Sequence, residues 1–569
     1  MENQQGRSIS RRQFLKGASA VGGAAVLSAI IAACGAAPTA APVNTAAPAA
    51  NTPAAASTTA AVAPAATSAP AATKPKSGGK ITWAIENDPV NLIPFGAIST
   101  SNQWGKEFIY DSLVEWDKDL LVKPALAESW TTPDDKTWIW NLRKGVKFHD
   151  GSEVTADDVK YSIDLQRTPP PPGIVIAQYP AANLVSVEVV DKYTVKFNMK
   201  GPEPTVLGYL AWSRYSAIIP KGAYDKMNLV TTGIGTGPLK LVEYVANDHV
   251  TYTRNKDFWK PGLPYLDDLV IKVLPDENSR VAALRSGQID GCTVTPDTAN
   301  SLKNDPNLVI LKGLFSAPRQ LQFTIKGDGK PWNKKAVRQA MSKAINRQDI
   351  IDKVYAGQAV LTGPIPPGYG DWFIPEAELK ATFYKYDVEG AKKLMADAGF
   401  ANGFDITLYA ISQPVEYTQI AEVVKEQLKL IGINVNVVSE EIGPFAKRNG
   451  DGSFDFCSTG RGMRHDPTGF INEYGRPTTG AAATWFNKGD GWKNDEAIAL
   501  YDKCVGELDP VKRHQQVRRI QEIALDEFPH ITTVQPYKFQ VVRKQVKDMY
   551  VAFTDFNTGL RTAWLDPTA

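Results

Sequence analysis

A histidine beside an acid is the residue pair in this sequence that comes nearest to a catalytic pattern. His149 and Asp150 lie in the run Phe148-His149-Asp150-Gly151. A histidine held by a carboxylate can act as a general base, but an Asp-Gly step is also ordinary turn chemistry. The sequence holds neither a G-x-S-x-G motif nor an H-E-x-x-H motif, which would supply a nucleophile or a zinc site. We therefore interpret the run as a turn and expect no catalytic residue.

A glycine-rich run and the histidines are two further sources of possible chemistry. Residues 233–238 read Gly-Ile-Gly-Thr-Gly-Pro, which lacks the Lys-Ser/Thr ending of a phosphate-binding loop and precedes an expected strand. We interpret this run as a turn. The histidines are too scattered to indicate a cluster of metal ligands, and they are His149, His249, His465, His514 and His530. We expect neither a metal nor a cofactor.

The composition is that of an ordinary globular protein. The 569 residues contain 63 Lys and Arg against 61 Asp and Glu, so the net charge is +2, without the basic excess typical of nucleic-acid binders. The length favours several domains. Four cysteines are too few for a disulfide scaffold. Cys292, Cys457 and Cys504 can form one pair at most, and the sequence leaves the pairing open.

The N-terminus has the layout of an export signal. Arg11 and Arg12 precede Phe-Leu-Lys, and a run of small and apolar residues follows over residues 17–33. The adjacent arginines resemble a twin-arginine signal, although the sequence does not decide between the two bacterial export routes. The run ends at Ala33-Cys34-Gly35, which resembles the lipobox of bacterial lipoproteins. We predict a signal peptide over 1–34 and lipidation of Cys34, which would anchor the protein to the cell membrane.

Residues 35–79 predict a disordered tether rich in Ala, Pro and Thr. The segment has no aromatic residue, and its prolines prevent one long helix. A coil of this length reaches on the order of 40 Å. With a lipid at one end, it would hold a folded body near the membrane, outside the cytoplasm.

The body of the chain, from Lys80 onward, is mainly β in its first half. Runs of β-branched and aromatic residues indicate strands, and two pairs of runs flank Asp191-Lys192 and Asn247-Asp248, as in hairpins. A short helix begins after Thr155, with acids in its first turn. The expected strands cover residues 81–85, 138–142, 185–190, 193–199, 239–245, 250–254 and 269–274.

The second half alternates helices with strands. Apolar residues recur at helical spacing, and glycines mark the helix ends. This alternation predicts an α/β lobe with parallel strands. The expected helices cover residues 335–355, 391–398, 420–431, 495–508 and 511–527, and the expected strands cover 405–409, 433–438 and 531–542.

Several sequence blocks together resemble one protein family. Leu-Ala-Glu-Ser-Trp at 126–130 is followed by Leu-Arg-Lys-Gly-Val-Lys-Phe-His-Asp-Gly at 142–151 and Thr-Ala-Asp-Asp-Val at 155–159. Arg-Val-Ala-Ala-Leu at 280–284 and Gly-Pro-Ile-Pro-Pro at 363–367 continue the series. Over roughly residues 80–550 the chain resembles the peptide/nickel-type (family five) extracytoplasmic solute-binding proteins of ABC importers.

The resemblance implies an α/β fold of the two-lobed, type II periplasmic-binding-protein kind, with an extra β-rich region inserted in the first lobe. Two chain crossings between the lobes would form a hinge, and the ligand would lie in the cleft. By analogy, lobe I takes residues 80–115, 225–315 and 538–569, the inserted region takes 116–224, and lobe II takes 316–537.

In this family the stretch that corresponds to residues 454–467 enters the cleft. In peptide-binding members, a Trp-x-x-Asp pattern precedes an acid-Pro pair, and the Asp of this pattern binds the ammonium of the peptide. Alignment on Asp466-Pro467 places Met463 at this position, with Arg461 and Arg464 beside it. A thioether cannot replace a carboxylate as a partner for a cation. We therefore hypothesise a ligand without a free ammonium here, one that is carboxylated, anionic or sugar-like.

Two alternatives to this interpretation stay open. In the first, the alignment is displaced by a residue or two and Asp466 itself binds the ligand. In the second, the arginines pair with Asp455 or Glu473 within the protein.

Aromatic and polar side chains complete the expected ligand-binding site. Trp and Tyr in a cleft offer a stacking face for sugar rings or apolar side chains, and neutral polar groups supply hydrogen bonds. Ordinary structural roles are the alternative for each residue. The candidates are Trp212, Trp372, Trp485, Tyr537, Asn91, Ser99 and Gln320.

The sequence thus predicts a binding protein and not an enzyme. We expect a monomer that captures a peptide or similar organic solute and delivers it to an ABC permease with its ATPase subunits. An oligosaccharide or an anionic solute is the alternative ligand. A ligand sensor, a chaperone and a secreted hydrolase are the rival classes of function.

Overall fold

The computed structural model describes residues 74–95, 100–167, 183–327, 329–475, 491–554 and 559–568. Residues 73–569 form one compact unit. The predicted signal peptide with Arg11, Arg12 and Cys34, and the tether up to residue 73, lie outside the described residues, as do Ser99 and Trp485. Among the helices of the described ranges, none has the length and apolar character needed to cross a bilayer.

The first sheet has eight strands within the described ranges, in the order β12-β19-β11-β1-β10-β9-β8, with β14 pairing with β19. β1 runs parallel to β10 and β11, and α6 (Glu277–Ser286) connects these two neighbours. The predicted hairpin of β8 and β9 is confirmed. The strands are β1 (Lys80–Ile85), β8 (Leu239–Val245), β9 (His249–Arg254), β10 (Asp268–Val273), β11 (Gly291–Val294), β12 (Leu308–Leu314), β14 (Ala359–Leu361) and β19 (Val534–Arg543).

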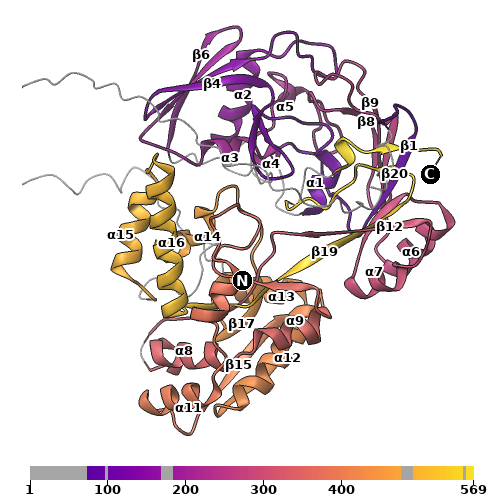
Figure 1. Ribbon diagram of the computed structural model, residues 1–569. Helices are drawn as coiled ribbons and strands as arrows, with labels where there is room; N and C mark the ends of the chain where they lie inside the picture. Colours follow the sequence, from indigo (N-terminus) through magenta and orange to yellow (C-terminus); the bar gives the residue numbers. More distant parts are fainter. Residues whose placement is uncertain are drawn as a thin grey trace, which may run out of the picture. The chain divides into compact units, whose positions relative to one another are not determined.

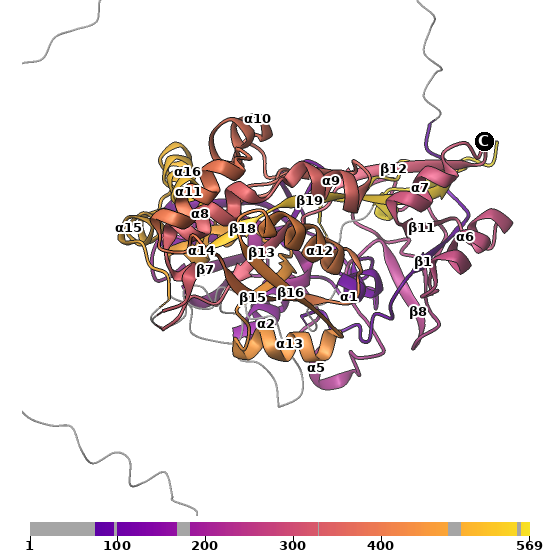
Figure 2. The ribbon, with the colours of Figure 1, turned by 90° about the horizontal axis from the view of Figure 1, so that it is seen from below.

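The second sheet has the order β16-β15-β17-β13-β18 within the described part of the chain. β15 is parallel to β16 and β17, which confirms the predicted α/β arrangement. The helices α12 (Glu416–Lys429) and α13 (Ile442–Asp451) both lie beside this sheet (Figure 2). Apolar residues of α12 pack on one face of β15, and Phe445 of α13 packs on the other. The strands are β13 (Arg319–Phe323), β15 (Phe404–Ile411), β16 (Ile433–Glu440), β17 (Phe456–Gly460) and β18 (His530–Thr532).

A third, antiparallel sheet has the order β4-β5-β7-β6, and its hairpin β6–β7 is the predicted one. Alternate residues of β5 and β7 face a core that includes Trp140 and Phe197, against which α2 packs. Short helices follow this sheet. The elements are β4 (Ala127–Asp134), β5 (Thr137–Leu142), α2 (Ala156–Arg167), β6 (Leu184–Asp191), β7 (Thr194–Met199), α3 (Val206–Leu210), α4 (Ser213–Ser216) and α5 (Ala223–Lys226).

The remaining elements are helices around the sheets and two small strand pairs. They are α1 (Thr100–Lys106), β2 (Val114–Trp116), β3 (Val122–Pro124), α7 (Pro296–Leu302), α8 (Lys335–Ala344), α9 (Arg347–Tyr355), α10 (Glu376–Glu378), α11 (Val388–Asp397), α14 (Thr468–Gly475), α15 (Asp495–Cys504), α16 (Pro510–Glu527), β20 (Val546–Lys547) and β21 (Trp564–Leu565), with short 3-10 or π turns at Pro331–Asn333, Leu379–Phe383 and Gly559–Arg561.

Two predicted elements are each divided in two. The apolar spacing over 335–355 predicts one helix, but Ile345 and Asn346 are extended, and the Asn346 side chain accepts the backbone N–H of Gln348 at 3.1 Å to begin α9. The predicted strand over 531–542 breaks at Thr533, because β18 pairs in the second sheet and β19 in the first. Periodicity detects the apolar face of such segments but not a local break.

The chain passes between the first and second sheets along β12 and β19 (Figure 1). These strands are antiparallel, from Leu308↔Arg543 to Leu314↔Tyr537. Residues 315–318 then lead from β12 to β13, and Thr533 alone separates β18 from β19. Side chains that face one side of this strand pair alternate with those that face the other.

Two glycines allow a close approach where the parallel strands β15 and β16 begin. A Cβ atom at Gly403 would lie 1.7 Å from the backbone oxygen of Gly432, and Gly403 has φ +72°. Gly399 also has a positive φ, of +87°, but a Cβ there would meet nothing within 4 Å. Gly403 and Gly399 therefore share the positive φ that strains other residues, but only at Gly403 would a Cβ atom clash with a neighbouring backbone.

We therefore expect Gly403→Ala to be much more destabilising than Gly399→Ala. Strain at positive φ costs about 1–2 kcal/mol and overpacking about 1–3 kcal/mol more, so the melting temperature (Tm) of Gly403→Ala should fall roughly twice as far. Differential scanning calorimetry of both variants checks this. Equal falls in Tm would contradict the close approach of the two backbones.

Candidate ligand-binding site

The loop that joins β17 to α14, residues 461–467, is the centre of the predicted site. Its first residue is tied to the segment before β13, because the N–H of Arg461 donates to the carbonyl of Pro318 at 3.0 Å. Its end is closed by a turn in which Asp466 accepts the N–H of Thr468 at 2.8 Å. The segment before β13 and the first residue of α14 therefore help to fix the course of the loop.

Tyr369 anchors the middle of this loop. Its hydroxyl donates to the carbonyl of Arg464 at 2.8 Å and accepts the N–H of Arg464 at 3.1 Å. The same hydroxyl lies 3.5 Å from Oγ of Ser316, in the segment that links β12 to β13. Burial raises the pKa of Tyr369, which keeps the hydroxyl neutral and able to donate. The loop is thus connected to the passage between the sheets.

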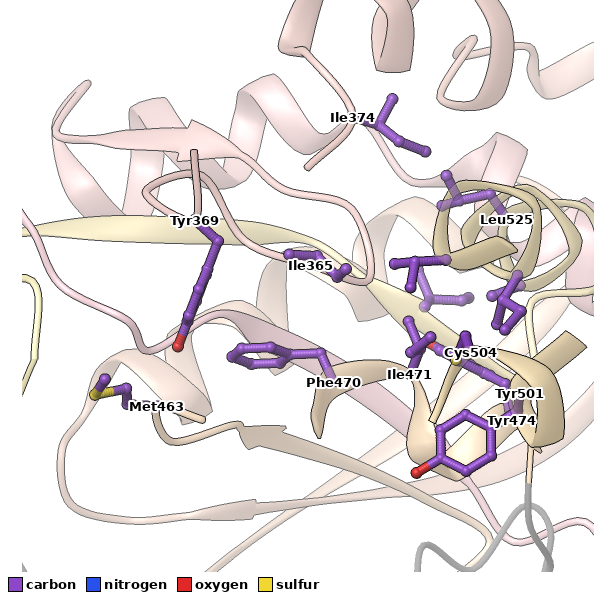
Figure 3. Close-up of a cluster of buried hydrophobic side chains, with 14 of the residues drawn as sticks. Ile365, Tyr369, Ile374, Met463, Phe470, Ile471, Tyr474, Tyr501, Cys504 and Leu525 are labelled. Atoms are coloured by element: carbon purple, nitrogen blue, oxygen red, sulfur yellow. The ribbon is translucent and has the colours of Figure 1, made fainter. Parts of the chain in front are cut away.

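Met463 lies inside the protein rather than on the surface of a cleft. It is 6% exposed and belongs to a large apolar cluster. Figure 3 shows its side chain on the same side of that cluster as Tyr369 and Phe470. A buried thioether does not hold the ammonium of a peptide.

Asp466 is engaged in a buried ion pair. Nη2 of Arg513, in α16, donates to its Oδ1 at 2.6 Å, and Thr468 contacts the same carboxylate. Arg513 also donates from Nε to the carbonyl of Cys504 at 3.3 Å and lies over the ring of Trp372 at 5.2 Å. Both residues are less than 10% exposed. The arrangement gives Asp466 a structural role in holding the end of the loop against α16.

Arg461 forms a second buried ion pair, with Glu473 of α14. Burial, together with the neighbouring Arg464, lowers the pKa of Arg461 to about 9, so it remains charged at neutral pH. Nδ1 of His530 lies 3.5 Å from Glu473, and Tyr474 lies 2.9 Å from the other ring nitrogen. Burial lowers the pKa of His530 to about 3, so this histidine is neutral.

Among the alternatives left open by the sequence, the structure shows the pairing of an arginine with Glu473, and this arginine is Arg461. Asp455 instead lies 3.1 Å from Lys330. Arg464 donates to the carbonyl of Gly469 at 3.3 Å and lies beside Phe470. The two arginines beside Met463 therefore have partners within the protein.

The third sheet's helices meet the same loop. A Cβ at Gly208 of α3 would lie 2.3 Å from the carbonyl oxygen of His465, and the rings of Tyr209 and His465 are 5.0 Å apart. Burial lowers the pKa of His465 to about 4. Trp212 is buried beside Trp116, with ring centres 6.1 Å apart. The helix α3, which follows the third sheet, thus contacts the loop of residues 461–467 at His465.

A cavity of about 220 Å³ lies where β1 ends. It is bounded by the carboxyl end of β1, by Thr293 of β11, by Trp104 of α1, and by Phe315 and Lys538 from the passage between the sheets. In open α/β sheets, ligands bind outside the carboxyl ends of parallel strands. Phe315 is next to Ser316, which contacts the Tyr369 anchor. A chain of contacts therefore leads from Phe315 in the cavity wall through Ser316 and Tyr369 to Arg464 in the loop of residues 461–467.

The other predicted residues lie at different places. Gln320 is buried in β13, and its Nε2 has no hydrogen-bond partner among the described residues. Trp372 packs beneath Arg513, next to the loop. Asn91 accepts the N–H of Ile93 at 3.2 Å within its own loop. Tyr537 lies under Lys312, whose Nζ is 3.9 Å from the ring centre, on the strand face away from Lys538.

Sequence reasoning missed three residues of this region. Lys538 stands directly beside the predicted Tyr537, and only the strand register shows which of the two faces the cavity. Arg513 lies in a helix 47 residues from Asp466, so no local signal connects them. Trp104 lies in α1, shortly after the loop that holds the predicted Asn91 and Ser99, and this closeness in sequence was the available signal.

The described residues contain no group of three or more His, Cys, Asp or Glu that could hold a metal ion. Cys292, Cys457 and Cys504 are buried and form no disulfide within the described ranges.

The fold and the region between the sheets define an α/β solute-binding protein of the two-lobed, type II kind, which is a binding protein and not an enzyme. Residues 122–482 match the family described as "Bacterial extracellular solute-binding proteins, family 5 Middle". The chain belongs to this family, which serves ABC importers. Residues 8–28 match the twin-arginine translocation signal, so the protein is exported.

Known proteins of similar sequence and structure are solute-binding proteins. The chain is 29% identical over 515 residues to heme-binding protein A of Haemophilus influenzae, covering 83% of this chain and 90% of that protein. It is 30% identical over 491 residues to di/tripeptide-binding protein 1 of Pseudomonas aeruginosa, covering 78% and 87%. The periplasmic binding protein DppA of Helicobacter pylori, solved with the peptide STSA, has a TM-score of 0.71 at 27% identity and covers 86% of this chain and 98% of that chain.

The Asp466–Arg513 pair leads to a prediction that separates a structural role from ligand binding. Removing one partner of a buried ion pair costs about 3–5 kcal/mol, because the other charge stays buried alone. We expect Asp466→Asn and Arg513→Met each to lower the Tm of the ligand-free protein, and the double variant to lower it by less than the sum. Thermal melts of the four proteins measure the coupling. A normal Tm for Asp466→Asn, with only ligand affinity reduced, would contradict the structural role.

Proposed function

We propose that this protein captures a peptide or similar organic solute between two lobes and delivers it to an ABC permease. The main support is its 30% identity, over 78% of the chain, to a protein named for binding di- and tripeptides. The structural neighbour solved with a four-residue peptide adds to this. The buried amide of Gln320 and the cavity at the end of β1 offer polar and apolar groups to such a ligand.

The proposed lobes follow the sheets. We assign residues 80–115, 225–315 and 538–569 to lobe I, 116–224 to the inserted region and 316–537 to lobe II. In support, β13 and β15 to β18 all fall within 316–537, and the third sheet falls within 116–224. β12 and β19 then form the hinge, and a ligand that contacts both lobes favours their closed arrangement.

The loop of residues 461–467 favours neither an anionic ligand nor an ammonium. Arg461 is already balanced by Glu473, so its charge does not require an anion from the ligand. Asp466 is balanced by Arg513, and Met463 is buried. The adjacent arginines therefore no longer support the oligosaccharide or anionic alternative. If the ligand is a peptide, no acid of this loop would bind its N-terminal ammonium.

Peptide binding should therefore depend little on the free ammonium. We expect tri- to pentapeptides to raise the Tm of the exported protein by mass action, and N-acetylation of the same peptides to change the dissociation constant by less than roughly threefold, since a lost ion pair with a buried carboxylate would cost far more. Isothermal titration calorimetry on each peptide and its acetylated form measures this. A rise in Tm with sugars or anionic solutes, and none with peptides, would replace the peptide by the alternative ligand.

We also propose that Cys34 carries lipid and that residues 35–79 tether the binding body to the membrane. The support is the lipobox-like sequence at the end of the export signal. A lipid-modified cysteine holds the ligand-loaded protein near the permease without a spanning helix.

Substitution of Cys34 should release the protein from the membrane. In cells grown with an alkyne fatty acid, we expect the wild-type protein to be labelled and to sediment with membranes, whereas Cys34→Ser remains unlabelled and appears in the soluble extracytoplasmic fraction. Cys292→Ser changes a cysteine of the body, which is buried, and serves as the control. Membrane attachment of Cys34→Ser would contradict the lipid anchor.

A further inference from the structure

The strand pair β12–β19 has a cavity on each of its two faces. The cavity opposite to the one at the end of β1 has a volume of about 300 Å³, and Ile310 and Phe539 form its floor. Phe539 directly follows Lys538 in β19, so the two side chains point to opposite faces, and Lys538 lines the cavity at the end of β1. Ile310 lies on the face of Phe539, because it pairs with Val541. We call the cavity on this face the rear cavity.

Two segments of the chain form the walls of the rear cavity. The helix α7, together with Lys303 directly after it, forms one wall, and Ala356 and Gln358, which follow α9, form the other. Figure 2 shows α7 and α9 beside β12 and β19. On the proposed assignment of the lobes, the first wall belongs to lobe I and the second to lobe II. A ligand that contacts both walls therefore binds best at one hinge angle.

The floor and the amides of the rear cavity suit a small organic ligand. Phe539 and Ala299 of α7 provide apolar surface, and both are buried. Asn300 and Gln358 line the same cavity with amide groups. Binding sites for small molecules combine an apolar surface with a few polar groups, and their volumes begin at roughly 300 Å³. The rear cavity therefore has the composition of such a site and a size at the lower end of the range.

Asp297 and Lys303 add two opposite charges to the wall of α7. The carboxylate of Asp297 has no hydrogen bond or ion pair with any residue that the structure describes. Nζ of Lys303 donates to Oδ1 of Asn300 at 2.9 Å, and an ammonium has two further N–H groups to donate. Asp297 would repel a simple anion, and Lys303 would repel a simple cation. A ligand that carries both charges meets the opposite charge at each end.

The spacing of these two charges sets the length of the ligand. Lys303 follows Asp297 by six residues of helical backbone, which is about 9 Å along the helix axis. An extended dipeptide spans about 7 Å, and the flexible side chain of Lys303 covers the difference. A free amino acid has about half that span, so it is too short to reach both groups.

We propose that the rear cavity is a second binding site, separate from the cleft, for a zwitterion of dipeptide size. Asp297 binds the ammonium of this ligand and Lys303 binds its carboxylate, while Phe539 and Ile310 receive an apolar side chain. The ligand class follows from the walls of the rear cavity alone. The site therefore goes beyond the proposed function and can exist whether or not the cleft binds peptides.

The test uses alanyl-leucine and N-acetyl-alanyl-leucine with the full-length exported protein. The lysines are methylated with ¹³C-formaldehyde, which retains their charge, and the Lys303 signal is assigned by its absence in Lys303→Met. We expect alanyl-leucine to shift this signal to saturation in the wild-type protein. N-acetylation should raise the dissociation constant about fivefold, as the loss of an exposed ion pair predicts, and Asp297→Asn should abolish this difference.

Asp305→Asn is the matched control for the charge of Asp297. Asp305 follows α7 and is not among the residues that line the cavity, and an asparagine keeps an oxygen that can accept the N–H of Asn307, which lies at 3.0 Å. We expect Asp305→Asn to keep the fivefold effect of acetylation. If the Lys303 signal of the wild-type protein does not shift, or if Asp297→Asn leaves the fivefold effect intact, the rear site is overturned.

The amide of alanyl-leucine tests the other end of the ligand. In Lys303→Met the binding is followed by the signal of Lys312, whose Nζ is 5.9 Å from the ring centre of Phe539. We expect amidation to raise the dissociation constant about fivefold in the wild-type protein and to have no effect in Lys303→Met. An effect of amidation that persists in Lys303→Met would overturn the zwitterion site.

The same measurements separate the rear site from the cleft. A saturating shift of Lys303 that depends on Asp297, in a protein that binds no tri- to pentapeptide by calorimetry, would support the rear site and contradict the peptide proposal for the cleft. Binding of these peptides without any shift of Lys303 by alanyl-leucine would support the cleft and overturn the rear site.

Discussion

The antiparallel pairing of β12 with β19 is the constraint on which the rest of this structure depends. These strands belong to the first sheet, and the segments that continue from them enter the second sheet as β13 and β18. Their register fixes which side chains face the end of β1 and which face α7. Because a shift of one residue would exchange the two faces, the pairing decides that a lysine and not a tyrosine lines the cavity.

Buried charges hold the loop of residues 461–467 in place. The pairs Arg461–Glu473 and Asp466–Arg513 attach its two ends to α14 and α16, and the Tyr369 hydroxyl attaches its middle to the segment near the hinge. Such pairs contribute little net stability relative to apolar residues, but the loss of one partner is costly. Their effect is therefore to select one conformation of the loop.

Much of the fold could be predicted from the sequence, because local signals determine it. Turn sequences such as Asn247-Asp248 locate the hairpins, and apolar periodicity locates α12 and the strands on either side of it. The break at Asn346 escaped prediction because both halves keep an apolar face. The site was harder to predict, since its contacts join distant residues. Asp466 looks like a ligand-binding acid until Arg513 is placed beside it.

Under the proposed function, the position of the cavity at the end of β1 connects ligand recognition with lobe movement. A ligand changes a conformational equilibrium only by the difference in its affinity for the two states. On the proposed assignment of the lobes, a ligand in the cavity at the end of β1 would touch β19, the segment after β12 and lobe I at once, because Lys538, Phe315 and Thr293 line that cavity. Contacts of this kind depend directly on the hinge angle, whereas contacts deep within one lobe are the same in both states. Under the proposed function, recognition beside the hinge would therefore contribute to closure as well as to affinity.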